Sequence, residues 1–355
     1  MIKRVVCCLL LAGSVLSLPL RAAVILQYHH VGSGYPDATS VSVERFRQHM
    51  DYLHEQQFSV VSLVSLVDAI KQGRTLPEKA VVITFDDAYE SVLLHATPIL
   101  QDRGWPYTVF ASTEAVDKGY QGVMSWEQLR EISRRGADIA NHTVSHSHLI
   151  RQYPEESEDN WQERVGLEID RAEQRIQDEV GHSHKLLAFP YGEYNLALLQ
   201  LMASRGFAGV GQQSGALGDW MDVRLLPRFP FAGAYGDLQD FAIKVNSLPL
   251  PVASVAFQGE SYSHWVEPVL SGPSRPVLKI KFGSERLDGL RCYATGQGQI
   301  DVDIVGSEAR VTASAALLPG RSRYNCTAAG PQGRFYWFSQ LFIIPQKDGS
   351  WYPEP

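Results

Sequence analysis

Val81-Val82-Ile83-Thr84-Phe85-Asp86-Asp87 is a run of apolar and β-branched residues that ends in two carboxylates. Such a run predicts a buried strand of a parallel sheet. Similar short runs recur before residue 250 and alternate with stretches whose apolar residues have helical spacing, which is typical of βα units. We therefore predict a parallel sheet. The expected strands cover 24–27, 60–61, 81–85, 107–110, 137–140, 186–189 and 208–210.

Polar or conformationally special residues follow four of these strands at the point where each strand ends. In a barrel of parallel strands the carboxyl ends meet on one face, and enzymes with this fold place their chemistry there. We therefore expect these residues to share one rim. They are His29 and His30, Asp86 and Asp87, His142 and His146, and Pro190 to Gly192.

His142 and His146 form the stronger signal for a metal site. A spacing of four lets two imidazoles meet one ion, although a pair of surface histidines explains the spacing alone equally well. An aspartate from a neighbouring strand end would complete three ligands with an open position for water, as in hydrolytic metal centres. Asp86 and Asp87 are adjacent and point in different directions, so we expect them to have different tasks.

Composition and charge limit the classes of function. The chain has 355 residues, 45% of them hydrophobic, and a formal net charge of −7, which argues against a nucleic-acid partner. Residues 1–23 have the features of a secretory signal peptide: Lys3 and Arg4, then an apolar stretch, then small residues. We expect a periplasmic or secreted protein, with an uncleaved membrane anchor as the alternative.

The spacing of the apolar residues changes after residue 247. Ser247 to Ser254 reads as a proline-punctuated linker, and alternating apolar residues follow it. We predict a barrel domain at 24–247 and a small all-β, sandwich-like domain at 252–355. Its aromatic run at 335–338 either packs in the β core or stacks on sugars. Cys292 and Cys326 are the only cysteines beyond the signal stretch, and an oxidising compartment favours a disulfide between them over a metal or redox pair.

Three motifs carry a family resemblance. Thr84 to Tyr89 reads TFDDAY, His142 to His146 reads HTVSH, and Phe189 to Gly192 reads FPYG. In this order, and at strand ends, they resemble the motifs of polysaccharide deacetylases, the NodB-homology group of carbohydrate esterase family four. The resemblance covers roughly residues 24–243. It implies a distorted (β/α) barrel of seven strands, so the expected fold is an α/β barrel followed by the all-β domain.

The resemblance also implies roles for individual residues. Asp87, His142 and His146 would bind a divalent metal, with zinc expected and nickel or cobalt as alternatives. Asp86 would be the general base that activates the attacking water. The backbone N–H of Tyr191, in the turn begun by Pro190, would stabilise the oxyanion. Trp220 would line the acetyl pocket, with a place in the core as its alternative.

The chain departs from the family pattern at three places. Ala88 stands where many members have glycine, and no arginine precedes Pro190, where many members carry one that steadies the base. Leu225 to Pro230 lacks the histidine that supplies the general acid. The biofilm poly-N-acetylglucosamine deacetylases are circularly permuted and carry this histidine on an N-terminal strand, as Tyr-His-x-Val/Ile. Tyr28 to Val31 resembles that pattern, so His29 is the expected acid and His30 a structural or supporting neighbour.

These inferences predict a metal-dependent hydrolase that removes N-acetyl groups from an amino-sugar polysaccharide outside the cytoplasm, such as poly-N-acetylglucosamine or a chitin-like polymer. An O-acetyl polysaccharide esterase and a carbohydrate-binding protein without catalysis are the alternatives. The expected partners are the acetylated polysaccharide and an envelope or exopolysaccharide-export assembly.

Overall fold

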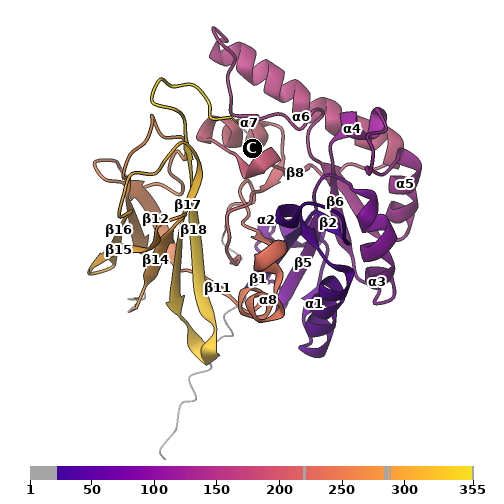
Figure 1. Cartoon of the computed structure of the whole chain (residues 1–355), viewed down its shortest axis with the longest axis horizontal. Helices are drawn as coiled ribbons and strands as arrows, with labels where there is room; N and C mark the ends of the chain where they lie inside the picture. The colour runs from indigo at the N-terminus through magenta and orange to yellow at the C-terminus, as the bar shows by residue number, and fades with distance from the viewer. Residues whose placement is uncertain (1–21, 219–220, 284–286, 288, 354–355) are drawn as a thin grey trace, which may run out of the picture.

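The computed structural model describes residues 22–218, 221–283, 287 and 289–353, so Trp220 and most of the predicted signal peptide lie outside the described residues. Figure 1 shows two parts, a barrel domain coloured indigo to pink and a β-rich part coloured orange to yellow. We call them the barrel domain (22–247) and the β domain (248–353). Among the helices of the described ranges, none is both long and apolar enough to cross a membrane.

The barrel domain is built on a curled sheet whose strands are all parallel, which confirms the predicted (β/α) fold. The strand order is β10-β1-β5-β6-β7-β8-β9, and β4 pairs with β5 outside this path. The strands are β1 Ala23–Tyr28, β4 Ser59–Val60, β5 Ala80–Phe85, β6 Tyr107–Ala111, β7 Ala137–Asn141, β8 Leu186–Ala188, β9 Ala208–Val210 and β10 Phe229–Pro230.

Strand β10 is absent from the strands expected from the sequence, and it occupies the gap between the two edges of the sheet. Leu226 forms a parallel bridge with Val210 in β9, and Phe229 then pairs with Leu26 in β1. A strand of two residues, one of them a proline, shows no periodicity, so the sequence pattern does not reveal it. As a result, the segment 225–230 lies alongside β1 and below the rim where β1 and β5 end.

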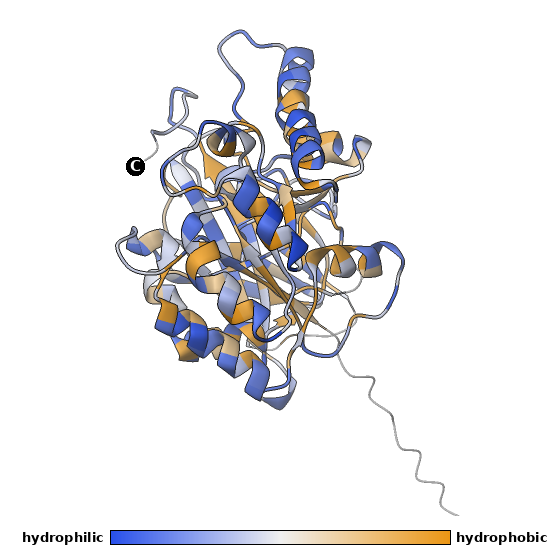
Figure 2. Cartoon of the chain, turned by 90° about the vertical axis from the view of Figure 1, so that its right-hand side faces the viewer, coloured by the Kyte–Doolittle hydropathy of each residue, from blue (hydrophilic) through white to orange (hydrophobic). Residues whose placement is uncertain are grey.

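Helices surround this sheet, and Figure 2 shows that they carry both hydrophilic and hydrophobic residues, as amphipathic helices do. Serine caps begin several of them, and Ser125 with Gln128 forms the predicted capping box. The helices are α1 Val43–Glu55, α2 Leu63–Lys71, α3 Thr97–Gln101, α4 Thr113–Asp117, α5 Trp126–Arg134, α6 Glu158–Val180, α7 Leu196–Ser204 and α8 Leu238–Val245.

The strand residues alternate between two cores. Val81, Ile83 and Phe85 of β5 pack with Phe46 and other buried residues of α1, whereas Val82 packs with α2 and with residues of the remaining strands. This alternation is the two-residue period of a strand. Both faces of β1 and β5 are thereby buried, which fixes the rim at their carboxyl ends.

The β domain is one antiparallel path of strands that ends with a short parallel pair, in the order β11-β18-β17-β14-β15-β16-β13-β12. The two ends of the path face each other, since Phe257 of β12 stacks on Phe342 of β18, so the domain is sandwich-like as predicted. The strands are β11 Leu248–Pro249, β12 Val252–Phe257, β13 Val277–Phe282, β14 Arg291–Ala294, β15 Gly298–Val305, β16 Glu308–Thr312, β17 Gly320–Ala329 and β18 Phe335–Ile344.

The β domain contains the segment predicted as a linker and the predicted disulfide. The segment predicted as a linker contains β11, which pairs with Tyr336 and Trp337, so the connection to the barrel is itself part of the sheet. Cys292 in β14 and Cys326 in β17 form a disulfide and lie opposite each other in the sheet register. Both cysteines are fully buried.

The two domains share a hydrophobic core. Leu341, Ile343 and Tyr352 of the β domain cluster with buried residues of β8, α6 and α7. Trp337 in β18 packs edge-on against Phe229 of β10 at a ring-centroid distance of 5.1 Å. This contact favours the packing interpretation of the aromatic run at 335–338. The β domain therefore supports the barrel close to the segment that closes the sheet.

Candidate active site

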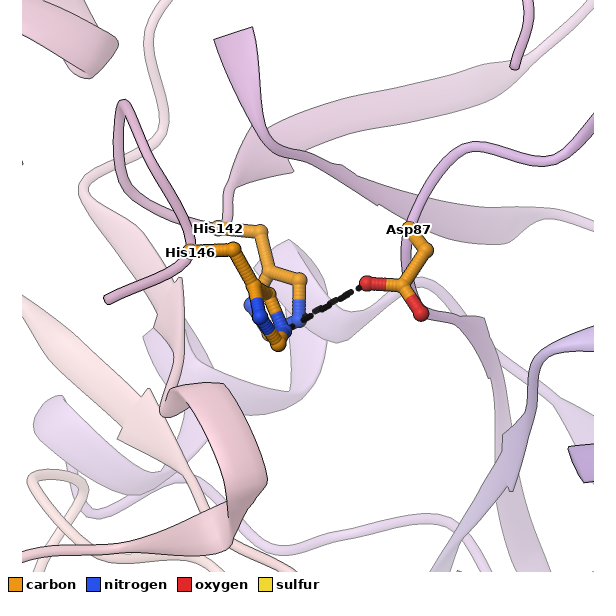
Figure 3. Close-up of side chains that lie close together, drawn as sticks. All are labelled: Asp87, His142 and His146. Carbon is orange, nitrogen blue, oxygen red and sulfur yellow. Dashed lines mark ion pairs between the residues drawn. The ribbon is translucent and has the colours of Figure 1, made fainter. Parts of the chain in front are cut away.

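Asp87, His142 and His146 meet at the carboxyl ends of β5 and β7. One carboxylate oxygen of Asp87, Oδ1, lies 3.4 Å from Nε2 of His142 and 3.5 Å from Nε2 of His146. Figure 3 shows both imidazoles turned toward the carboxylate. Within the described residues this is the one group of three or more metal-ligand side chains whose donor atoms all lie within 4.8 Å of one another.

The hydrogen bonds and charges around His142 are suited to a bound cation. Nδ1 of His142 donates to the carbonyl oxygen of Ala188 at 2.8 Å, and this bond leaves Nε2 directed at Asp87. Burial lowers the pKa of His142, but the carboxylates of Asp87 and Asp86 outweigh burial and raise it. The site thus favours positive charge between these groups. A divalent metal held by one carboxylate and two neutral imidazoles would supply that charge.

Unusual backbone conformations turn the side chains into this site. Asp87, Thr143, His146 and Tyr191 all have φ between 56° and 68°, in the left-handed region that ordinary residues rarely occupy. Strained backbone of this kind concentrates at functional sites. Ala88 is fully buried and has φ of 51°, a backbone conformation that glycine adopts at less cost than alanine.

Asp86 is fully buried and held by Arg228. The guanidinium donates two parallel hydrogen bonds, from Nη1 to Oδ1 at 2.7 Å and from Nη2 to Oδ2 at 2.8 Å. Nε of Arg228 donates to the carbonyl oxygen of Gly211, so the guanidinium is itself fixed. Burial raises the pKa of Asp86, but the charges of Arg228 and His142 outweigh it and hold the pKa at about 2.

Arg228 therefore corrects the inference that this chain lacks an arginine beside Asp86. The arginine is present, and it comes from the segment 225–230 rather than from the residues before Pro190. That segment pairs with β1, and Arg228 donates from it to Asp86 at the end of β5. A single arginine inside the apolar stretch Leu225 to Phe231 was the available signal, because a buried charge requires a partner.

Gln27 also binds the Asp86 carboxylate. Its amide nitrogen donates to Oδ2 at 2.7 Å. A carboxylate has about four acceptor positions, and the donors of Arg228 and Gln27 occupy three of them. Asp86 therefore retains acceptor capacity at Oδ1 only. Gln27 is a polar residue among the apolar residues of β1, and this was the only signal for it in the sequence.

His29 and His30 differ in their surroundings. Nε2 of His29 lies 3.9 Å from Oδ2 of Asp86, and its side chain is 20% exposed. His30 is buried and stacked between Tyr35 and Tyr89, at ring-centroid distances of 4.1 and 3.6 Å. Burial lowers the pKa of His30 to about 4. His29 is thus the histidine of the pair that lies beside Asp86 and reaches solvent.

Pro190 to Gly192 forms a short turn beside the histidines. The Tyr191 ring lies 4.7 Å from the His146 ring and stacks on His148 at 3.8 Å. A Cβ at Gly192 would meet Cβ of Gln212 at 2.6 Å, so this glycine allows a close approach as well as a φ of 69°. Pro190 is buried, and its carbonyl accepts from the backbone N–H of Glu193.

The barrel domain is similar to known polysaccharide deacetylases in sequence and in fold. Residues 73–210 match the family described as Polysaccharide deacetylase. The structure is similar to that of Streptococcus pyogenes deacetylase PplD in complex with acetate, with a TM-score of 0.57 and 20% sequence identity over 63% of this chain and 98% of that chain. At this level of identity the similarity concerns the fold.

Two curated proteins illustrate the sequence similarity. YxkH of Bacillus subtilis is 26% identical over 194 residues, which cover 54% of this chain and 65% of that protein. Poly-beta-1,6-N-acetyl-D-glucosamine N-deacetylase of Escherichia coli is 25% identical over 264 residues, which cover 64% of this chain and 39% of that protein. The chain thus spans less than two thirds of the length of either relative.

Proposed function

We propose that this protein is a metal-dependent hydrolase that removes N-acetyl groups from an amino-sugar polysaccharide outside the cytoplasm. The observation that carries the proposal is the arrangement of two different carboxylates on one rim. Asp87 faces two imidazoles, as a metal ligand does, whereas Asp86 faces Arg228 and His29. Hydrolysis needs one carboxylate to hold a metal and another to accept a proton, whereas simple binding of a sugar needs neither.

In this proposal Asp87, His142 and His146 hold the metal. A bound divalent ion would polarise the acetyl carbonyl and lower the pKa of a water molecule. His142 is suited to this role because the carbonyl of Ala188 fixes its ring. Nitrogen and oxygen donors of this kind accept zinc, nickel or cobalt, and we propose zinc.

Asp86 and His29 would handle the protons. Asp86 takes a proton from the water that attacks the acetyl carbon, and Arg228 holds its carboxylate in one orientation while this happens. His29 gives a proton to the amine nitrogen as the C–N bond breaks, so acetate and a free amino sugar leave. The backbone N–H of Tyr191 would stabilise the negative charge on the former carbonyl oxygen.

Similarity and compartment support the choice of substrate. The Escherichia coli relative is named as acting on poly-beta-1,6-N-acetyl-D-glucosamine. The buried disulfide of the β domain suits a protein that folds in an oxidising compartment. We therefore propose a β-linked N-acetylglucosamine polymer as the substrate, met in the periplasm or outside the cell, in or near an export assembly.

Acetate release from a panel of substrates tests this function. Residues 24–355 are purified, freed of metal with a chelator and reloaded with zinc, nickel or cobalt. They are then assayed on β-1,6- and β-1,4-linked N-acetylglucosamine oligomers and on acetylated xylan. We expect metal-dependent release from the β-1,6 oligomers. Release from xylan alone would favour an O-acetyl esterase, and glycan binding without any release would leave a binding protein.

A further inference from the structure

A buried carboxylate connects the β domain to the active-site rim. Glu193 belongs to the barrel domain and follows the Pro190–Gly192 turn directly, and it is 1% exposed. From the β domain, Tyr352 donates to Oε1 of Glu193 at 2.6 Å and Arg321 donates to the same oxygen at 2.9 Å. The other oxygen, Oε2, lies 2.7 Å from Nδ1 of His148 in the barrel domain.

The partners of Glu193 also enclose Tyr191. The ring of His148 stacks on the Tyr191 ring with only 8° between their planes. The guanidinium carbon of Arg321 lies 5.3 Å from the centroid of the same ring. Arg321 therefore contacts both Glu193 and Tyr191, and His148 does so as well. These contacts hold the tyrosine whose φ of 59° is in the left-handed region.

We infer that the β domain is a positioning device for the active site, and that Arg321 and Tyr352 act through Glu193 to hold the backbone N–H of Tyr191 toward the substrate carbonyl. This inference rests on the proposed function for its catalytic consequence. It assigns the β domain a role in the barrel's reaction that is separate from binding sugar. Neither Arg321 nor Tyr352 needs to touch the substrate for this role.

The charged groups around Glu193 can hold the Tyr191 backbone more firmly than a hydrophobic contact between the domains could. A left-handed conformation at a residue other than glycine costs of order 1–3 kcal/mol, so the loop needs contacts that enforce it. A carboxylate with several hydrogen-bond donors has few alternative orientations, whereas apolar contacts between the domains tolerate sliding. Arg151 adds a further positive charge 3.6 Å from Oε1 of Glu193. Glu193 is thus fixed from both domains.

Single substitutions at the three network positions test the inference. Arg321→Ala and Glu193→Gln are expected to lower kcat about ten- to a hundredfold, because loss of an oxyanion donor costs at most about a hundred- to a thousandfold. KM and bound metal per chain should change little. Tyr352→Phe removes one hydroxyl and should cost a few-fold, and Arg321→Lys should restore part of the loss caused by Arg321→Ala.

The controls are exposed residues of the same type in the β domain, one on β16 and one on β14. Arg310→Ala removes an exposed arginine that pairs with Glu308, and Tyr293→Phe removes the hydroxyl of a partly exposed tyrosine. Both should keep wild-type kcat. If these controls lose as much activity as the network variants, or if lost activity tracks lost metal, the inference is overturned.

Hydrogen exchange of the peptide spanning residues 189–194 supplies a readout that does not depend on turnover. Exchange at this peptide should become faster in Arg321→Ala and Glu193→Gln and stay unchanged in the controls. Unchanged exchange in both network variants would refute the positioning role even if the protein is active. If wild-type protein releases no acetate, the proposed function fails, and the exchange data still decide whether the β domain holds this turn.

Discussion

Arg228 and Asp86 form a fully buried ion pair with two parallel hydrogen bonds, although 142 residues separate them in the sequence. The pair joins the segment that closes the curled sheet to the end of the β5 strand. Removing two such charges from water is costly, and a buried pair rarely adds net stability over apolar residues. Its value here is orientation, because the fork of the guanidinium fits the carboxylate in one way.

Substitution of Arg228 should therefore harm activity even where the protein still folds. Arg228→Lys keeps a positive charge but cannot donate two parallel hydrogen bonds from one planar group, so we expect kcat to fall at least about tenfold. Arg228→Met leaves Asp86 buried without its partner, which should lower the free energy of unfolding by about 3–5 kcal/mol. Acetate release and urea unfolding measure the two effects.

A double variant separates orientation from stability. Arg228→Met combined with Asp86→Asn removes both charges, so it should regain much of the stability lost by Arg228→Met while remaining inactive. If the double variant were as unstable as the single one, the buried-charge explanation would be wrong. Wild-type turnover of Arg228→Lys would equally count against an orienting role for the guanidinium.

His29 should matter more for amides than for esters. An amine is a poor leaving group unless it is protonated, and general acid catalysis contributes on the order of a hundredfold or more. His29→Ala should therefore lower kcat about a hundredfold on N-acetylglucosamine oligomers and much less on an O-acetylated substrate. His54→Ala, on an exposed part of α1, is the matched control. Equal losses on both substrates would exclude the role of His29 as acid.

Substitution of a proposed metal ligand should have a different effect from substitution of Asp86. Asp87→Ala and His146→Ala should lower metal affinity about tenfold or more and abolish turnover at low metal concentration, because each deletes a ligand. Asp86→Asn should leave metal content unchanged while turnover falls. Elemental analysis after dialysis, compared with acetate release, distinguishes the two classes. Loss of metal in Asp86→Asn would move that residue into the ligand set.

Much of this fold could be predicted from the sequence because its strands are strongly apolar. β5 is an apolar run, broken only by Thr84, that is buried along its whole length, so its existence could be predicted from the pattern alone. β10 and β11 could not be predicted in the same way. Each has only two residues, one of them a proline, and each exists because a neighbouring strand offers hydrogen-bonding groups, which is a tertiary effect.

Some residues of the candidate site could likewise be predicted from the strands, whereas others depend on tertiary contacts. Asp87, His142 and His146 follow strands, so their meeting on one rim could be inferred from the parallel sheet. Arg228 could not be placed, because its position depends on how the segment 225–230 closes the sheet. Glu193 gave no signal, since a glutamate after a turn is ordinarily exposed, whereas this one is buried among partners from both domains.

Reduction of the disulfide should weaken the β domain and, through the shared core, the whole chain. Cys292 and Cys326 are 34 residues apart, and closing a loop of that length stabilises a folded protein by up to about 4 kcal/mol. The variant Cys292→Ser with Cys326→Ser should therefore unfold at lower urea concentration than the oxidised protein. Reductant should reproduce the shift in wild type and have no effect on the variant. A midpoint that stays unchanged would mean that the bridge contributes nothing.

His49 should make stability fall in mildly acidic solution. It is fully buried in α1, where Nε2 donates to the carbonyl of Gly236 and Nδ1 accepts from the hydroxyl of Tyr28. Burial lowers its pKa from 6.5 to about 4, so the unfolded chain binds a proton that the folded chain rejects between these values. Its contribution is complete above about pH 6.5 and is lost as the pH falls toward 4, by at most about 3 kcal/mol.

His49→Gln isolates this effect because a glutamine amide can make both hydrogen bonds and does not titrate. Urea unfolding at pH 7.5 and pH 4.5 should show a smaller acid-induced loss of stability in His49→Gln than in wild type, by about 2–3 kcal/mol. His54→Gln, at an exposed position of the same helix, should behave like wild type. If wild type and His49→Gln lose equal stability on acidification, other groups such as the stacked His30 cause the whole acid sensitivity.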